Sequence, residues 1–142
     1  MVVSGLKKDI NLLSDDLNNK KIKNLKLNVS APFHCKYMKK ASEKMSSYIN
    51  GLKMNDLEKP IISNVTANET ISSEEIKSLL ISQIEKKVRW LESVEYMINC
   101  GVKNFVEIGP GKVLSGLIKR INKNVNVSSI NSEEDIKLLI ND

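Results

Sequence analysis

The stretch that decides the fold is Asn104-Phe105-Val106-Glu107-Ile108-Gly109-Pro110-Gly111-Lys112-Val113-Leu114. Residues 104–108 are mostly apolar and predict a short strand. Gly109-Pro110-Gly111 predicts a sharp turn, because glycine accepts unusual dihedral angles and proline makes the entry rigid. Apolar residues then recur every three or four positions over 113–121, which predicts a helix. A further strand is expected at 125–130.

The same alternation of strands and helices extends over most of the chain. The spacing of apolar residues predicts strands and helices in turn, with strands at 1–4, 22–29 and 60–65 and helices near 6–17, 37–52, 76–84 and 94–98. Ser72 and Glu75 are expected to form a capping box before the helix at 76–84. Strands and helices that alternate after short loops predict a mostly parallel α/β sheet.

Composition limits the classes of function. The chain has 142 residues, of which 41% are hydrophobic, so it is long enough to bury a core. No run of about 18 apolar residues is present, which excludes a membrane span. Aromatic residues make up only 4%, so stacking platforms for nucleic acid are few, and the net charge of +5 favours acidic partners. Two isolated cysteines suit a reducing cytoplasm, and with one histidine they do not make a metal site.

His34 is the only histidine of the chain. Imidazole is the one side chain that ordinarily takes up and releases a proton near neutral pH. His34 follows a predicted strand and Pro32, in a loop before a long helix, and loops often display catalytic groups. On these residues alone a structural or surface histidine is favoured, because no Gly-x-Ser-x-Gly nucleophile is present.

Three other features have plain explanations. Cys35 is not expected to pair with His34, because adjacent side chains point apart, and Cys100 is expected to be a small core residue. Gly109 to Lys112 does not form a phosphate loop, since Val106 stands where that motif needs its first glycine. Three lysines flank the histidine loop, and charge alone favours simple solvation over a landing patch for phosphates or an acidic protein: Lys36, Lys39 and Lys40.

A set of short motifs, taken in order, points further. They are Val29-Ser30-Ala31-Pro32-Phe33-His34, Met38-Lys39, Asn64-Val65, Gln83 with Val88-Arg89-Trp90, Ser93-Val94, and residues 107–114. Together they resemble the C-terminal portion of malonyl-CoA:acyl carrier protein transacylases, over essentially the whole chain. The resemblance implies an α/β fold, the C-terminal part of an α/β-hydrolase-like acyltransferase domain (residues 30–142). Half of a ferredoxin-like subdomain, strand-helix-strand, would precede it at residues 1–29.

The resemblance also implies a reaction. In that family a serine in a Gly-His-Ser-x-Gly segment takes malonyl from malonyl-CoA and passes it to acyl carrier protein in fatty acid biosynthesis. His34 matches the family's general base and acid, and Gln83 matches the residue whose backbone carbonyl orients it. Phe33 would help to shape the acyl pocket, and Lys36, Lys39 and Lys40 would contact carrier protein or CoA. No metal or other cofactor is implied, and neither nucleic acid nor membrane is an expected partner.

The nucleophilic serine is the missing part of this pattern. Since no Gly-His-Ser-x-Gly segment occurs in the chain, the resemblance implies a cytoplasmic fragment that supplies the base and is inactive alone. Two alternatives stay open at this point. One is an acyltransferase domain from a polyketide or multifunctional synthase, and the other is a non-catalytic binding module on the same scaffold.

Overall fold

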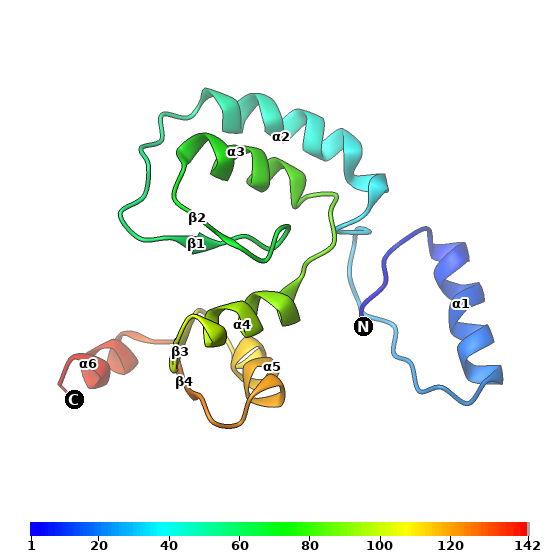
Figure 1. Ribbon diagram of the computed structural model, residues 1–142. Helices are drawn as coiled ribbons and strands as arrows, with labels where there is room; N and C mark the ends of the chain where they lie inside the picture. The colour runs from blue at the N-terminus through cyan, green and yellow to red at the C-terminus, as the bar shows by residue number, and fades with distance from the viewer. Residues whose placement is uncertain (142) are drawn as a thin grey trace. The chain divides into compact units, whose positions relative to one another are not determined.

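The computed structural model describes residues 1–141, with side chains described for residues 1–137 (Figure 1). The chain divides into two compact units, Met1–Arg89 and the part from Trp90 onward. This division differs from the subdomains implied by the resemblance, 1–29 and 30–142. That subdomain assignment, whose last residue lies outside the described residues, stays a prediction.

The first unit begins with a helix between two extended segments. Helix α1, Lys7–Asn19, confirms the predicted apolar periodicity. Residues 1–6 and 22–29 form no strand, so the two strands predicted there are wrong. A strand needs a partner for its backbone N–H and C=O groups and a surface for its apolar side chains. Leu25 is 85% exposed and Val29 62% exposed, which shows that this surface is missing.

Two helices form the body of the first unit. After the short helix η1 (Lys36–Met38) come α2 (Lys39–Gly51) and α3 (Ser73–Ser82), which lie side by side (Figure 1). Ile49 of α2 and Ile76 of α3 are buried, and the Ser42 hydroxyl donates to the Ile81 carbonyl at 3.4 Å. The long helix predicted at 37–52 is therefore confirmed in its main part.

A small hairpin connects these helices. The strand predicted at 60–65 is reduced to β1, Ile61–Ile62, which pairs antiparallel with the unpredicted β2, Glu69–Thr70. Helix α3 begins after Ser72, whose hydroxyl accepts from the Glu75 N–H at 3.4 Å, so the serine half of the predicted capping box is confirmed. The expected return bond from the Glu75 side chain to the cap is replaced by a bond to the hairpin. The Glu75 carboxylate accepts from the Thr70 hydroxyl, and in this way the cap is tied to the hairpin.

The second unit contains the strand-turn-helix segment that opened the sequence. Its elements follow in the order α4 (Trp90–Asn99), β3 (Asn104–Ile108), α5 (Val113–Ile121), β4 (Asn126–Ile130) and α6 (Glu133–Asn141). Gly109 and Gly111 have φ of +134° and +96°, which confirms the sharp turn. Strands β3 and β4 are parallel, with Phe105 opposite Val127. Val94, Phe105, Ile118 and Val125 form the core of this unit.

The sheet prediction is correct only in this second unit. Among the described residues the strands form two separate pairs, and the β1–β2 pair is antiparallel. Parallel pairing follows where a helix crosses from one strand to the next, as α5 does, whereas the short loop after β1 permits only a hairpin. None of the helices within residues 1–141 has the length and apolar character needed to cross a membrane.

Candidate active-site histidine

His34 lies in a tightly bonded turn of the first unit. Its backbone φ is +59°, an uncommon conformation for a residue other than glycine. Hydrogen bonds hold the residues on both sides: the Ser4 hydroxyl donates to the Phe33 carbonyl at 2.7 Å, and the Cys35 thiol donates to the Pro32 carbonyl at 3.0 Å. A residue held in such a conformation by its surroundings is typical of functional sites.

The imidazole of His34 contacts one specific partner. Its Nδ1 lies 2.7 Å from the backbone carbonyl oxygen of Gln83, while the side chain itself is exposed. A carbonyl oxygen only accepts hydrogen bonds, so Nδ1 must carry the hydrogen. In the neutral imidazole Nε2 then has the free lone pair. The structure thus brings together the two residues that the resemblance paired.

The Gln83 carbonyl is held in place by the end of α3 and by a neighbouring loop. Gln83 is the C-cap of α3, where the last carbonyls of a helix lack partners inside the helix. Its side-chain oxygen accepts from Asn64 Nδ2 at 3.4 Å, and the Asn64 carbonyl accepts from the Arg89 N–H at 2.8 Å. Arg89 Nη1 also donates to the Thr66 carbonyl at 2.8 Å. Backbone and side-chain bonds therefore surround the carbonyl that His34 contacts.

Asn64 and Arg89 take part in these bonds, although sequence reasoning gave them no role. Both residues occur in the ordered motifs, as Asn64-Val65 and Val88-Arg89-Trp90. This occurrence was the only indication in the sequence that they belong near the site. Their hydrogen bonds mainly involve backbone groups of residues that are distant in the sequence. A short motif does not reveal such contacts. The three lysines near the loop are exposed: Lys39 lies 3.8 Å from Glu43, and Lys36 Nζ is 5.5 Å from the Tyr37 ring centroid.

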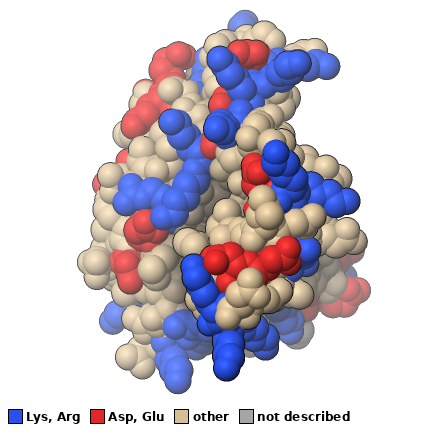
Figure 2. Space-filling model, turned by 90° about the vertical axis from the view of Figure 1, so that its right-hand side faces the viewer, with Lys and Arg blue, Asp and Glu red and all other residues tan. Residues whose placement is uncertain are grey.

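The remaining candidates lie elsewhere. Phe33 is 49% exposed beside His34. Cys100 is exposed, so its expected place in the core is wrong, because it follows the last turn of α4 with its side chain toward solvent. Within residues 1–141 no three His, Cys, Asp or Glu side chains gather closely enough to hold a metal ion. Lysine and arginine side chains are abundant on the face drawn in Figure 2, with acidic side chains among them.

The turn after β3 is occupied by a side chain of the protein. The Glu107 carboxylate accepts from the Leu114 and Ser115 N–H groups, at 3.0 and 2.7 Å, and so caps α5. Hydrogen bonds from the side chain and the backbone of Ser115 hold the Glu107 pKa below its usual value. A helix N-terminus that already binds a carboxylate does not offer its N–H groups to phosphate. This contact supports the structural explanation of the Gly109–Lys112 turn.

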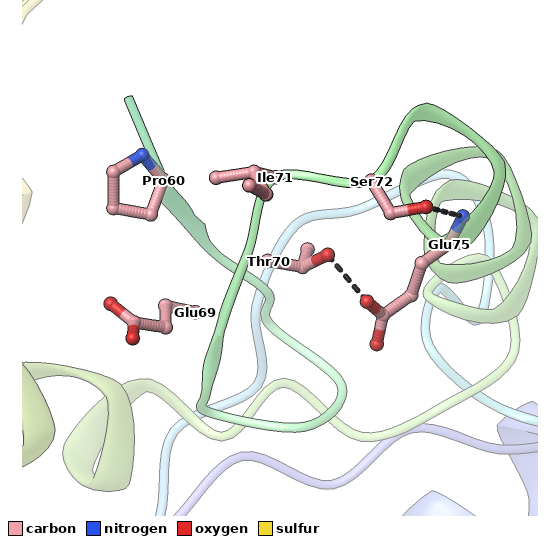
Figure 3. A pocket seen from close by; sticks show the side chains of 6 residues that line it. All are labelled: Pro60, Glu69, Thr70, Ile71, Ser72 and Glu75. Carbon is pink, nitrogen blue, oxygen red and sulfur yellow. Dashed lines mark hydrogen bonds between the residues drawn. The ribbon is translucent and has the colours of Figure 1, made fainter. Parts of the chain in front are cut away.

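A shallow hollow of about 370 Å³ opens beside the β1–β2 hairpin (Figure 3). Its lining residues are Pro60, Glu69, Thr70, Ile71, Ser72 and Glu75. The polar groups of Thr70, Ser72 and Glu75 bond to one another, as the dashed lines of Figure 3 show. His34 does not line this hollow, which is therefore separate from the candidate site.

Solved structures with the same fold define the class of protein. An acyl-carrier-protein S-malonyltransferase from Burkholderia pseudomallei matches with a TM-score of 0.88 and 33% identity, over 96% of this chain and 45% of that one. A malonyl-transacylase solved in complex with a type II PKS acyl-carrier protein matches with a TM-score of 0.87 and 34% identity, over 97% of this chain and 45% of that one. The chain therefore has an α/β acyltransferase fold, as predicted.

Curated relatives match almost the whole of this chain. The malonyl CoA-acyl carrier protein transacylase of Staphylococcus aureus (strain MSSA476) is 44% identical over 96% of this chain, and that of Bacillus subtilis (strain 168) is 39% identical over 99%. No family model matches the chain. The chain is homologous to the C-terminal portion of the malonyl CoA-acyl carrier protein transacylases, and it spans 45% and 44% of the length of these two relatives.

Proposed function

We propose that this chain supplies the general base and acid for transfer of malonyl from malonyl-CoA to acyl carrier protein, a step of fatty acid synthesis. His34 is that group. The nucleophilic serine comes from the portion of the fold that the relatives carry and that this chain does not span. The observation that carries the proposal is the 2.7 Å contact between His34 Nδ1 and the Gln83 carbonyl, which leaves Nε2 free to accept a proton.

The chemistry follows from this tautomer. Nε2 takes the proton of the serine hydroxyl as its oxygen attacks the thioester carbon of malonyl-CoA. The carbon–sulfur bond then breaks, and the CoA thiolate leaves with the proton from Nε2. In the second half the carrier-protein thiol gives its proton to Nε2 and attacks the malonyl-serine ester, and the serine oxygen recovers that proton. Nδ1 keeps its hydrogen and its bond to Gln83 throughout, so the ring does not turn.

Nuclear magnetic resonance of the chain tests the tautomer directly. Because His34 is the only histidine, two-bond ¹H–¹⁵N correlations from labelled imidazole report on this residue alone. We expect the neutral ring to show hydrogen on Nδ1 and none on Nε2. A ring with its hydrogen on Nε2 would contradict the proposed orientation.

Activity is tested in a chimaera in which this chain replaces the matching C-terminal portion of the S. aureus relative. His34→Ala should lower the rate of serine acylation by malonyl-CoA about 10²- to 10⁴-fold, the usual contribution of a general base. The matched control is Cys35→Ser, which retains a donor to the Pro32 carbonyl and should leave the rate nearly unchanged. Full acylation by the His34→Ala chimaera would refute the assignment. The chain alone is expected to transfer no malonyl.

We further propose that Lys36, Lys39 and Lys40 contact the acidic carrier protein. All three are exposed and follow the His34 loop closely in sequence, which supports the proposal. In the chimaera, the double substitution Lys36→Glu with Lys40→Glu should raise the carrier-protein KM at low salt, and less so at high salt, because salt screens exposed charges. Lys7→Glu with Lys8→Glu on α1 makes the same charge change as a control. An unchanged KM in the first variant would contradict this contact.

The proposed role places the chain in the cytoplasm with malonyl-CoA and carrier protein. Phe33, half exposed beside His34, would border the acyl group. The chimaera also distinguishes acyl units: a preference for another acyl-CoA would favour the synthase-type alternative, and binding of carrier protein without any acylation would favour a non-catalytic module.

A further inference from the structure

His34 differs from the other residues that have a left-handed backbone. Within residues 1–141, Lys21 and Ala67 are the other non-glycine residues with positive φ. Lys21 directly follows the C-cap of α1, where this conformation is common. Ala67 lies in the β1–β2 connection, and its N–H donates to the Ser63 carbonyl at 2.9 Å. His34 lies in the loop before η1, at neither a helix C-terminus nor a hairpin, so other contacts must maintain its φ of +59°.

One such contact comes from Ser4, in the segment before α1. The Ser4 hydroxyl donates to the Phe33 carbonyl at 2.7 Å, across 29 residues of sequence. The Cys35 thiol also bonds within the loop, to the Pro32 carbonyl, but that bond spans only three residues. Ser4 is partly buried and belongs to the same unit as His34. The Ser4 bond therefore attaches the backbone of the histidine loop to a segment that is distant in sequence.

The Phe33 carbonyl belongs to the peptide group that directly precedes His34. A peptide group is planar and turns as one rigid unit, so the direction of this carbonyl and the φ of His34 change together. For a residue with a Cβ atom, the left-handed region is disfavoured by contact between Cβ and a backbone oxygen. A hydrogen bond that fixes the Phe33 carbonyl therefore opposes the return of His34 to negative φ.

The φ of His34 also decides where its imidazole lies. A change from +59° to a typical helical φ turns the Cα–Cβ bond by about 120° relative to the preceding peptide. The Nδ1 atom contacts the Gln83 carbonyl at 2.7 Å, and the two residues are 49 positions apart in sequence. A contact of this length does not survive such a turn of the side chain, so the left-handed backbone is a condition for the contact.

We propose that Ser4 is a positioning residue for His34. Its hydroxyl holds the Phe33–His34 peptide in the direction that keeps His34 left-handed and the imidazole against the Gln83 carbonyl. This conformational role stands on the contacts described above. Its consequence for catalysis rests on the proposed function, in which His34 is the general base.

Nuclear magnetic resonance of the full chain tests the role in Ser4→Ala. Because the chain has one histidine, the imidazole spectrum reports the Gln83 contact, and the His34 backbone couplings report φ. We expect the ratio of His34 without the contact to His34 with it to rise about 2- to 5-fold, as for the loss of one hydrogen bond that water can reach. Ser4→Thr retains a hydroxyl and should restore the spectrum of the unchanged chain.

Ser46→Ala is the matched control. The Ser46 hydroxyl donates to the Glu43 carbonyl on α2, also at 2.7 Å and also in an exposed bond, so the substitution removes the same kind of contact. Circular dichroism establishes that each variant retains its helices. The Ser46→Ala spectrum of His34 should be unchanged, and a change equal to that of Ser4→Ala would overturn the proposal. An unaltered Ser4→Ala spectrum would also overturn it, as would a Ser4→Thr spectrum like that of Ser4→Ala.

The chimaera with the S. aureus portion measures the catalytic consequence. Ser4→Ala should lower kcat for serine acylation in proportion to the fraction of His34 that keeps the Gln83 contact, and Ser4→Thr should restore it. The KM for malonyl-CoA should stay the same, because Ser4 acts through His34. An altered spectrum with an unchanged kcat would support the positioning role and contradict the proposed function. An unaltered spectrum in an active chimaera would overturn the positioning role and leave the proposed function standing.

Discussion

Val94→Ala is the sharpest test of the packing in the second unit. Val94 has no exposed surface and packs with Phe105, Ile118 and Val125. The substitution removes two methyl groups, which at about 0.8 kcal/mol each amounts to about 1.6 kcal/mol of lost transfer free energy. The cavity left between a helix and a sheet relaxes only partly, which raises the expected loss to about 2–3 kcal/mol. Val106→Ala, at a 45% exposed position of β3, should cost less than about 1 kcal/mol.

The assay is urea unfolding followed by the fluorescence of Trp90, the only tryptophan, which packs against the same cluster. With a urea m-value of about 1–3 kcal/mol per molar, the Val94→Ala midpoint should fall by about 0.7–3 M. The m-value should not change if only the native packing is weakened. Equal midpoint shifts for Val94→Ala and Val106→Ala would refute the placement of Val94 in the core and of Val106 at the surface.

Two further predictions concern single contacts. Glu107→Gln should lower the thermal midpoint at pH 7, because the folded-state pKa of Glu107 lies below its ordinary 4.5. The stability that the carboxylate contributes is present above pH 4.5 and is lost as the pH falls through the folded-state pKa. The two melting curves should therefore converge in acid. Asn64→Ala removes the 3.4 Å hydrogen bond to the Gln83 side chain, which is worth about 0.5 kcal/mol. The fraction of His34 that lacks its Gln83 contact should therefore rise about twofold, as measured in the imidazole spectrum. Asn68→Ala, at an exposed position, is the control.

Local patterns in the sequence predicted most helices correctly. Helices α1, α3 and α5 follow from apolar spacing, a serine cap and a glycine-proline turn, which are properties of neighbouring residues. The strands expected at 1–4 and 22–29 have equally good patterns and do not form. A strand exists only with a partner, and the alternation of side chains does not report whether the chain provides one. For the same reason β2 was missed, since it exists only as the partner of Ile61–Ile62.

The candidate site was predictable only through the resemblance. Composition and spacing favoured an ordinary surface histidine, and the ordered motifs changed that interpretation. Two features of the site could not be predicted from local pattern: the left-handed backbone of His34, and the Asn64–Arg89 bonds behind Gln83. The backbone conformation of His34 depends on how one particular loop closes. The Asn64–Arg89 bond joins segments that lie 25 residues apart in sequence.

One comparison tests whether the first unit is sufficient to orient the His34 imidazole. The bonds around His34 that involve Ser4, Asn64, Gln83 and Arg89 all lie within the first unit. If the base is built by the first unit alone, the Nδ1–H tautomer should be present both in the chain by itself and in the chimaera. A tautomer that forms only in the chimaera would mean that the missing portion orients the imidazole, and the contact with Gln83 would then be insufficient.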